Sequence, residues 1–340
     1  MARIAIVTPA RAGSRTGNRH TAARWARMLR AAGHRVAVLT QWRGERCDLL
    51  VALHATRSFA SVERYRAAQP AAPLAVVLTG TDLYRDLPAS AEARRSLELG
   101  DRLIVLQDEA LRRLAPRLRR KTTVVYQSAD PAVRHAPGQR GFRVAVLGHL
   151  REEKDPFRAA DALAYLSADV EVLQLGAALS PAMAREARRR MTREPRYRWL
   201  GSVPHARALC VLASSHVLVV SSRMEGGANV IAEAARIGTP VLASRVPGNV
   251  GMLGRNYPGY FALGDERALA RLVLRMHSDA GYALHLRRAL RARRKLFAPA
   301  AERAALLRAL GPLLRPRGRG SSTSARPGPT GRASDRRTRH

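Results

Sequence analysis

The sequence predicts an α/β protein made of two tandem, doubly wound (Rossmann-like) domains that face a central cleft. Short runs of nearly continuous apolar residues alternate with amphipathic helical segments, a pattern typical of a parallel sheet covered on both faces. The alternation stops in the proline- and glycine-rich stretch 131–141 and then begins again. With 340 residues, of which 46% are hydrophobic, the chain is long enough to bury two cores.

The individual elements follow from the same pattern. In the first half we expect strands at 4–8, 35–39, 49–53, 74–78, 102–106 and 122–125, with a helix over 18–32 that ends at Gly33. In the second half we expect strands at 143–147, 170–175, 197–200, 217–220 and 240–243. We therefore expect domains over 1–137 and 138–290, a helix over 291–314 that packs back across them, and a disordered arginine-rich tail over 315–340.

The formal net charge of +34 is carried almost wholly by arginine, because Lys121, Lys154 and Lys295 are the only lysines. The arginines are spread over nearly every predicted helix, and aromatic residues make up only 5% of the chain. Specific recognition of nucleic acid needs a localised basic face or stacking residues, so we expect no specific nucleic-acid partner. We expect only weak binding to polyanions at low salt, and a small acidic ligand fits the charge equally well.

Features that the sequence lacks limit where we expect the protein to be located and which cofactors we expect it to bind. No run of 18 apolar residues predicts a membrane span, and residues 1–7 have the pattern of a buried strand rather than of a leader. The cysteines, Cys47 and Cys210, lie far apart and have no metal-type spacing, which favours a reducing compartment and a cytoplasmic protein. The sequence has no Asp-x-Asp pair of the kind that holds a divalent ion, so we expect no metal and no cofactor.

The strongest motif covers residues 221–234 and directly follows a predicted strand. It contains Glu225 and Glu233, which are eight residues apart, with Gly226, Gly227 and Asn229 between them. A helix that starts near Gly227 puts both carboxylates at the cleft, where they suit the hydroxyl groups of a sugar. The two glycines let backbone amides approach a ligand, and free amides at a helix start suit a phosphate. The alternative is an ordinary helix N-terminus in which an acidic residue in the first turns only stabilises the helix.

A second motif covers residues 146–156, between a predicted strand and a predicted helix. It contains His149, Arg151 and Lys154. Cations at this position would stabilise a departing diphosphate. The alternative is a solvated turn of mixed charge.

A third motif is the loop 9–21 after the first strand. It lacks the Gly-x-Gly-x-x-Gly pattern of a nicotinamide or flavin site, but glycines and arginines near a helix start predict an anion-binding loop. The residues that we assign to this loop's site are Gly13, Arg15, Thr16, Gly17, Asn18 and Arg19. The alternative is an ordinary flexible loop.

Two further strand ends carry polar residues. His54 follows the strand 49–53, while Thr81 and Asp82 follow the strand 74–78. His54 or Asp82 is a candidate for proton transfer or acceptor binding. A lone histidine or aspartate at a strand end is more often a structural hydrogen-bonding group, and that alternative stays open.

The motif around Glu225 and Glu233 resembles the Glu-x7-Glu motif of the large GT-B family that includes retaining glycosyltransferases of the sucrose-synthase and glycogen-synthase kind. The resemblance implies that Glu225 holds the donor sugar and Glu233 the nucleotide ribose. It implies that Lys154 contacts the donor diphosphate, although His149 stands where the family usually has arginine, and Arg151 is our candidate for the second cation. It further implies that the loop from Gly13 reaches across the cleft to donor and acceptor.

Four phrases, at 16–25, 78–86, 148–158 and 222–231, resemble a narrower family, the selenosugar synthases of the selenoneine pathway. The resemblance runs from about residue 3 to residue 310. It implies transfer of N-acetylglucosamine from its UDP derivative to selenophosphate, which gives a 1-seleno-sugar. The alternatives are another acceptor, a UDP-sugar 2-epimerase, or an arginine-rich nucleic-acid binder.

Overall fold

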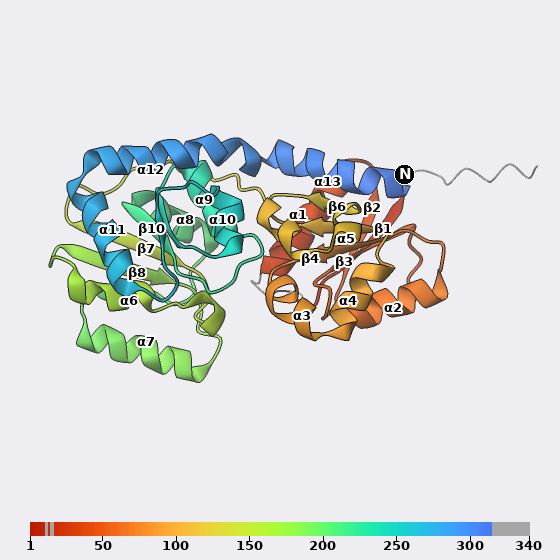
Figure 1. Cartoon of the computed structure of the whole chain (residues 1–340), viewed down its shortest axis with the longest axis horizontal. Helices are drawn as coiled ribbons and strands as arrows, with labels where there is room; N and C mark the ends of the chain where they lie inside the picture. Colours follow the sequence, from red (N-terminus) through yellow and green to blue (C-terminus); the bar gives the residue numbers. More distant parts are fainter. Residues whose placement is uncertain (11–12, 14–16, 315–340) are drawn as a thin grey trace, which may run out of the picture.

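The computed structural model describes residues 1–10, 13 and 17–314. Figure 1 shows two α/β halves side by side, with α12 (Ala280–Arg293) and α13 (Pro299–Leu314) running along one side of both. Each half contains a sheet of six parallel strands. The predicted fold class is confirmed. The predicted tail, 315–340, lies outside the described residues.

The N-terminal half has the strand order β2-β1-β3-β4-β5-β6. Its strands are β1 (Arg3–Val7), β2 (Arg35–Leu39), β3 (Leu49–Leu53), β4 (Leu74–Leu78), β5 (Arg102–Val105) and β6 (Thr122–Val124). Its helices and short helical turns are α1 (Gly17–Arg30), α2 (Phe59–Ala68), η1 (Asp82–Asp86), α3 (Leu87–Ala89), α4 (Ala91–Leu99), η2 (Asp108–Arg113) and α5 (Pro116–Arg119). Because β2 and β3 lie on opposite sides of β1, the order reverses there, and a crevice for ligands opens at such a point.

The C-terminal half has the order β12-β11-β10-β7-β8-β9, which reverses between β7 and β10. Its strands are β7 (Phe142–Leu147), β8 (Val170–Leu175), β9 (Tyr197–Trp199), β10 (Val217–Val220), β11 (Val241–Ser244) and β12 (Tyr260–Phe261). Its helices before the C-terminal pair are η3 (Glu152–Lys154), α6 (Arg158–Ala162), η4 (Leu163–Tyr165), α7 (Pro181–Arg193), α8 (His205–Ser214), α9 (Asn229–Ile237), α10 (Pro247–Leu253) and α11 (Glu266–Ser278).

The structure differs from the predicted elements mainly at their ends. Strand β12 was not predicted because it has only two residues, which pair with Ala243 and Ser244 of β11. Such a short edge strand carries too little periodicity to be detected. The other strands agree to within one or two residues, which is the usual uncertainty of element boundaries.

The buried strands explain why the apolar runs are nearly continuous. All five residues of β3 and of β4 are buried, because helices cover both faces of a parallel sheet. Two core clusters lie on opposite faces of the N-terminal sheet, and alternate residues of β3 belong to each: Leu49 to one and Leu50 to the other. A third cluster fills the C-terminal half.

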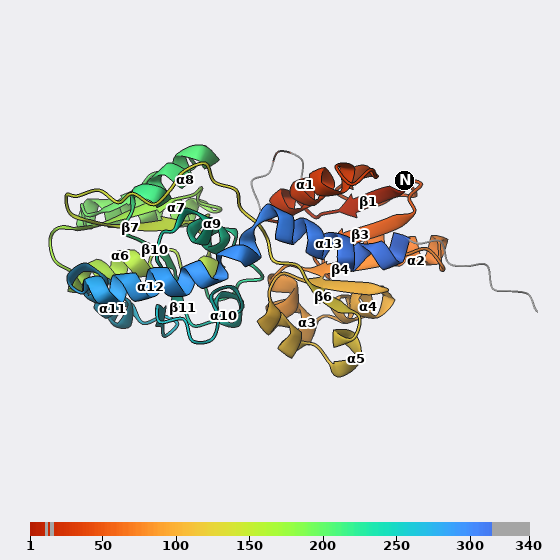
Figure 2. The same cartoon turned by 90° about the horizontal axis from the view of Figure 1, so that it is seen from above.

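The last helix leaves the C-terminal half and packs on the N-terminal one. Figure 2 shows α13 lying along the N-terminal half, next to α1. Four of its side chains (Ala305, Leu306, Ala309 and Leu310) belong to the same core cluster as Ile4 and Trp25. The chain therefore crosses between the halves twice, once after β6 and once through η5 (Arg294–Phe297).

The only acidic residue of α13, Glu302, is buried in this contact. Its carboxylate accepts hydrogen bonds from Trp25 Nε1 at 2.7 Å and from the backbone N–H of Ser128 at 2.8 Å. The Ser128 hydroxyl also donates to it, and Arg24 Nε lies 2.8 Å away as an ion pair. One carboxylate thus links α13 to α1 and to the segment that connects the two sheets.

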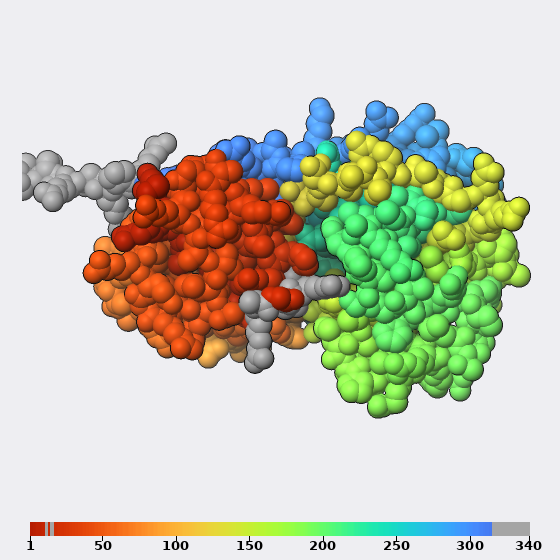
Figure 3. All heavy atoms as spheres, turned by 180° about the vertical axis from the view of Figure 1, so that it is seen from behind, coloured from red at the N-terminus to blue at the C-terminus, as the bar shows by residue number. Residues whose placement is uncertain are grey.

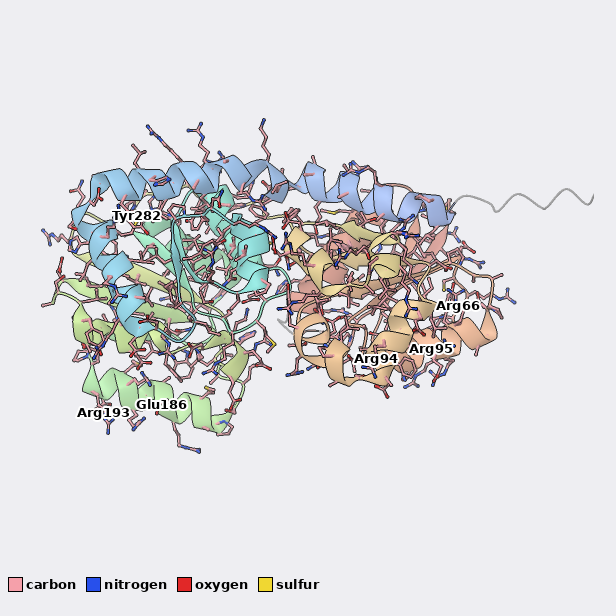
Figure 4. The ribbon with its side chains drawn as sticks, viewed as in Figure 1. Arg66, Arg94, Arg95, Glu186, Arg193 and Tyr282 are labelled. Carbon is pink, nitrogen blue, oxygen red and sulfur yellow. The ribbon has the colours of Figure 1, made fainter. Side chains whose placement is uncertain are left out.

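The surface carries the excess positive charge on both halves. Arginine side chains such as Arg94 and Arg95 on α4 and Arg193 on α7 lie at the periphery (Figure 4), and they belong to different halves. This distribution agrees with charge spread over many helices. Among the described residues, no helix has both the length and the apolar character needed to cross a membrane.

Replacing Glu302 should loosen α13 from the N-terminal half. We expect Glu302→Ala to cost about 3–5 kcal/mol of unfolding free energy, because it leaves buried donors and Arg24 without their acceptor. Urea unfolding followed by circular dichroism measures this loss. The matched control is Arg303→Ala, an exposed neighbour on the same helix. Equal stability of the two variants would contradict the assigned role of Glu302.

Candidate active site

The candidate site lies where the C-terminal sheet reverses its strand order. The loop after β7 carries His149, Arg151 and Lys154, and the loop after β10 carries Glu225. Since β7 and β10 are neighbours in the sheet, the carboxyl ends of these strands bring the second and the first motif together. Figure 3 shows the molecule from behind, with a hollow between the N-terminal half in red and orange and the C-terminal half in green.

Lys154 and Glu225 form an ion pair between these two loops. Glu225 is only 7% exposed, and its Oε1 also accepts a hydrogen bond from the Ser222 hydroxyl at 2.6 Å. The Ser221 hydroxyl donates to the carbonyl oxygens of Lys154 and Asp155, at 3.1 and 2.8 Å. The loop after β10 therefore fixes the turn at Lys154 in two ways. Ser221 bonds to the backbone of this turn, and Glu225 pairs with the lysine side chain.

The N-terminus of α9 follows this pair, two residues later than the sequence indicated. The N-cap residue, Ala228, offers no side chain to the first backbone amides. The side-chain oxygen of Asn229 is buried and has no hydrogen-bond partner among the described residues. Uncapped amides at a helix N-terminus attract anions, because the helix dipole adds to their own partial charge. The arrangement thus suits a phosphate group next to Lys154.

Glu233 lies on the second turn of α9 and meets a histidine that the sequence analysis did not single out. His205 Nε2, at the start of α8, lies 2.8 Å from Glu233 Oε1. This hydrogen bond raises the pKa of His205. His20, on α1 of the other half, lies near the same group: burial lowers its pKa, and the charges of His205 and Arg24 lower it further. Each histidine lies on the connection that follows a strand, which is the sequence signal that could have found them.

His149 is oriented by the neighbouring loop. Its Nδ1 accepts a hydrogen bond from the backbone N–H of Ala177 at 3.2 Å. Arg151 is half-buried at the N-cap of η3. Gly148 and Gly176 bring these two loops together, because a Cβ on Gly176 would lie 2.0 Å from the carbonyl oxygen of Gly148. This motif thus carries one lysine, one arginine and one histidine on one loop, and its Lys154 pairs with Glu225 in the loop before α9.

The start of α1 faces the start of α9 across the cleft. A Cβ on Gly17 would lie 3.9 Å from Nδ2 of Asn229. Asn18 and Arg19 follow in the first turn of α1, and Gly13 is exposed with a positive φ of 80°. Arg15 and Thr16 lie outside the described residues. The described residues of the third motif therefore lie next to the first motif, because Gly17 is close to Asn229.

The geometry around Asp82 favours its structural alternative over proton transfer. Asp82 is fully buried, and its carboxylate accepts hydrogen bonds from the backbone amides of Ala55, Thr79, Gly80 and Leu83 at 2.7–3.1 Å. These backbone amides occupy the carboxylate oxygens, which are therefore not directed at a ligand in the cleft. Asp82 instead ties the loop after β3 to the loop after β4.

Because Asp82 links these two loops, His54 and Thr81 lie beside each other. His54 Nε2 is 3.0 Å from Thr81 Oγ1 and 4.0 Å from Asp86 Oδ2. Burial lowers the pKa of His54, while the carboxylates of Asp82 and Asp86 oppose the shift. His54 is therefore neutral near pH 7.

Beside these loops the main chains of the two halves touch directly. A Cβ on Gly226 would lie 2.0 Å from the carbonyl oxygen of Thr79, and one on Gly80 would lie 2.7 Å from the backbone nitrogen of Gly226. The Arg85–Glu153 ion pair, at 3.2 Å, also joins the halves. Thr81 is consequently close to the loop that carries Glu225. Within the part of the chain that the structure describes, no group of three or more metal-ligating side chains is arranged to hold an ion.

The family described as "Glycosyl transferases group 1" matches residues 107–279, just over half of the 340 residues. The chain belongs to this family. It is therefore a glycosyltransferase with the GT-B fold, and the matched region contains both loops of the candidate site, with Lys154, Glu225 and Glu233.

Several solved structures share this fold over most of the chain. HepE from Anabaena, in complex with UDP and glucose, has a TM-score of 0.75 and 16% identity, over 92% of this chain and 100% of its own. Sucrose-phosphate synthase from Thermosynechococcus elongatus has a TM-score of 0.74 and 18% identity, over 92% and 99%. The pneumococcal O-GlcNAc transferase GtfA, in complex with UDP and GlcNAc, has a TM-score of 0.62 and 16% identity, over 78% and 57%.

A side chain at Gly226 should keep the halves of this glycosyltransferase apart. We expect Gly226→Ala to increase the radius of gyration measured by small-angle X-ray scattering. The reaction should slow by about 100-fold in kcat/KM, since groups misplaced by an ångström lose about that much. The control is Gly138→Ala, whose Cβ would have no atom within 4 Å. If Gly226→Ala has the same radius of gyration and the same kcat/KM as this control, the backbone contact at Gly226 does not determine how closely the two halves approach.

Proposed function

We propose that the protein transfers N-acetylglucosamine from UDP-N-acetylglucosamine to selenophosphate and so forms a 1-seleno-sugar for selenoneine biosynthesis. The observation that carries the donor half of this proposal is the Lys154–Glu225 pair beside the uncapped start of α9. A cation and free amides next to a buried carboxylate suit a diphosphate joined to a sugar. The structures of HepE and GtfA with UDP support a uridine nucleotide as the carrier.

In the proposed donor complex each residue has a separate task. Lys154, Arg151 and His149, together with the amides of Gly226, Gly227 and Asn229, neutralise the diphosphate. Glu225 orients the sugar through its hydroxyl groups, and Glu233 binds the ribose. When the donor binds, Lys154 contacts the phosphate and keeps only part of its contact with Glu225. The hydrogen bond between His205 and Glu233 breaks, and Glu233 binds the ribose instead. We also assign Gly13 to donor binding.

The proposed acceptor follows from the resemblance to selenosugar synthases and from the charge of the opposite wall. Asn18 and Arg19 present an amide and a cation at the start of α1, where Gly17 faces Asn229. Together with Arg15, Thr16 and Thr81, they would hold a small phosphate-like anion. The unpaired cysteines, Cys47 and Cys210, favour the reducing cytoplasm as the place of this reaction.

The chemical step exchanges one bond for another. The selenium of selenophosphate attacks the anomeric carbon, a carbon–selenium bond forms, and the bond from that carbon to the diphosphate oxygen breaks. The bonding electron pair leaves with UDP, whose growing negative charge is stabilised by Lys154 and the amides of α9. We propose that this charge stabilisation needs neither a metal ion nor a further cofactor. The selenium still carries the phosphoryl group at this stage. Water then attacks the phosphorus, the phosphorus–selenium bond breaks, and phosphate leaves the 1-seleno-sugar.

The direct test is product formation by the purified full-length protein. We expect UDP release from UDP-N-acetylglucosamine that depends on selenophosphate, with a selenium-bearing hexosamine in the mass spectrum. UDP release without selenophosphate would instead indicate a 2-epimerase or donor hydrolysis. Turnover with a different acceptor and not with selenophosphate would agree with a glycosyltransferase but would contradict selenophosphate as its acceptor.

Removal of the Lys154 charge should impair catalysis more than folding. We expect Lys154→Ala to lower kcat by about 100- to 1000-fold, the usual effect of losing one electrostatic group at the developing charge. The matched control is Lys295→Ala, an exposed lysine on η5. Steady-state UDP release and isothermal titration with UDP separate the loss of kcat from the loss of donor affinity. Wild-type rates in Lys154→Ala would remove Lys154 from the mechanism.

A further inference from the structure

His54 has an unusual backbone at the end of β3. Its φ is 74°, and Asp155 is the only other non-glycine residue with a positive φ in the described part of the chain. The backbone N–H of His54 donates to Val77, and its carbonyl oxygen accepts from Ser58, so the strained conformation is held from both sides. Unfavourable backbone conformations that a structure maintains in this way cluster at functional sites.

The hydrogen bonds of the ring decide which nitrogen carries the proton. His54 Nδ1 accepts the backbone N–H of Arg57 at 3.3 Å, so Nδ1 carries no hydrogen. In the neutral ring Nε2 is then the donor. Nε2 lies 3.0 Å from Thr81 Oγ1, which accepts this proton, while the Asp86 carboxylate is 4.0 Å away, too far for a hydrogen bond.

The same arrangement decides the role of the Thr81 hydroxyl. Its oxygen accepts from His54, so its own proton is available to a third group. The structure gives this hydroxyl no second hydrogen bond with a described residue. Thr81 is half-buried and directly follows Gly80, whose backbone touches Gly226. A donor is therefore held at the junction of the two halves, next to the loop of Glu225.

We propose that His54 is a positioning residue that fixes the Thr81 hydroxyl as a hydrogen-bond donor to an acceptor substrate bound as an anion. This inference rests on the proposed function and specifies the chemical class of its acceptor. A neutral alcohol acceptor needs a base to take its proton, but His54 presents a proton and Asp82 is occupied by four backbone amides. An acceptor that is already an anion needs donors instead, and Thr81 is one.

The charged groups around His54 are consistent with a neutral ring at working pH. Asp82 and Asp86 favour the protonated ring, whereas burial, Arg57 and Arg85 disfavour it, and the net effect lowers the pKa of His54. Burial acts to raise the pKa of Asp86, but hydrogen bonds from Arg85 and Thr56 outweigh it and hold that pKa below its usual range. The ring thus donates to Thr81 without being a cation.

Four variants separate positioning from base catalysis. Thr81→Val removes the hydroxyl and keeps the shape, so KM for selenophosphate should rise about 10- to 100-fold, as expected for a lost hydrogen bond to a charged group. Thr81→Ser retains the hydroxyl and should stay near wild type. His54→Gln cannot accept a proton as a base, yet its amide can donate to Thr81 and accept from Arg57. It should turn over at the wild-type rate, while His54→Ala should resemble Thr81→Val.

The opposite pattern would overturn the inference. If His54→Gln turns over about 100-fold more slowly, the range of general base catalysis, and Thr81→Val is unaffected, His54 is a base. Donor affinity, measured by titration with UDP, should not change in either Thr81 variant. A wild-type enzyme that uses another acceptor and not selenophosphate contradicts the proposed function. The effect of Thr81→Val on the acceptor that is used then still tests the inference.

A measurement without turnover tests the ring directly. In protein labelled with ¹⁵N at histidine, the resonances lost in His54→Gln identify His54, and we expect them to show a neutral ring with the proton on Nε2 at pH 7. A proton on Nδ1, or a doubly protonated ring, would overturn the inference whatever the acceptor is.

Discussion

The candidate site depends on a place where the two halves meet with no side chain between them. The main chain at Thr79 and Gly80 in the loop after β4 lies directly against Gly226 in the loop after β10. Even one methyl group there would collide with backbone, which cannot rotate away as a side chain can. Glu225, Lys154 and the start of α9 lie on one side of this contact, and Thr81 and His54 lie on the other. The two glycines therefore allow the two sides of the site to approach this closely.

The approach of the halves is supported from the opposite side by α13. This helix belongs by sequence to the end of the chain, yet it completes a core cluster of the N-terminal half. Glu302 anchors it through Trp25, Arg24 and Ser128. Since Ser128 lies in the connection between the two sheets, the same carboxylate holds the helix and the connection together. The two crossings of the chain thus join the halves in addition to the contact of Gly80 with Gly226 and the Arg85–Glu153 ion pair.

The electrostatics of the site differ from those of the surface. The chain carries a net charge of +34, but the residues of the site are paired: Lys154 with Glu225, Arg85 with Glu153, and His205 with Glu233. Pairing holds Lys154 in one geometry and reduces the cost of its partial burial. An anionic ligand that replaces one partner then meets charges that are already oriented, which is the arrangement that favours charge development in a reaction.

The sequence alone determined the fold class and the position of the motifs in it. Apolar periodicity reports burial along a short stretch of chain, so it located the strands, and strand ends located Lys154, Glu225 and Glu233. It also indicated that His54, Thr81 and Asp82 follow neighbouring strands. What each residue does there depends on partners that are distant in the chain, and local pattern carries no information about them.

The tertiary structure alone decided those partners. It showed that Asp82 is occupied by backbone amides from two loops, that His205 meets Glu233, and that His20 approaches them from the other half. It also showed the hydrogen bond between Trp25 and Glu302, which are 277 residues apart. Such contacts arise only when segments that are distant in the chain pack together, because packing is set by the shape of whole surfaces and not by the period of any segment.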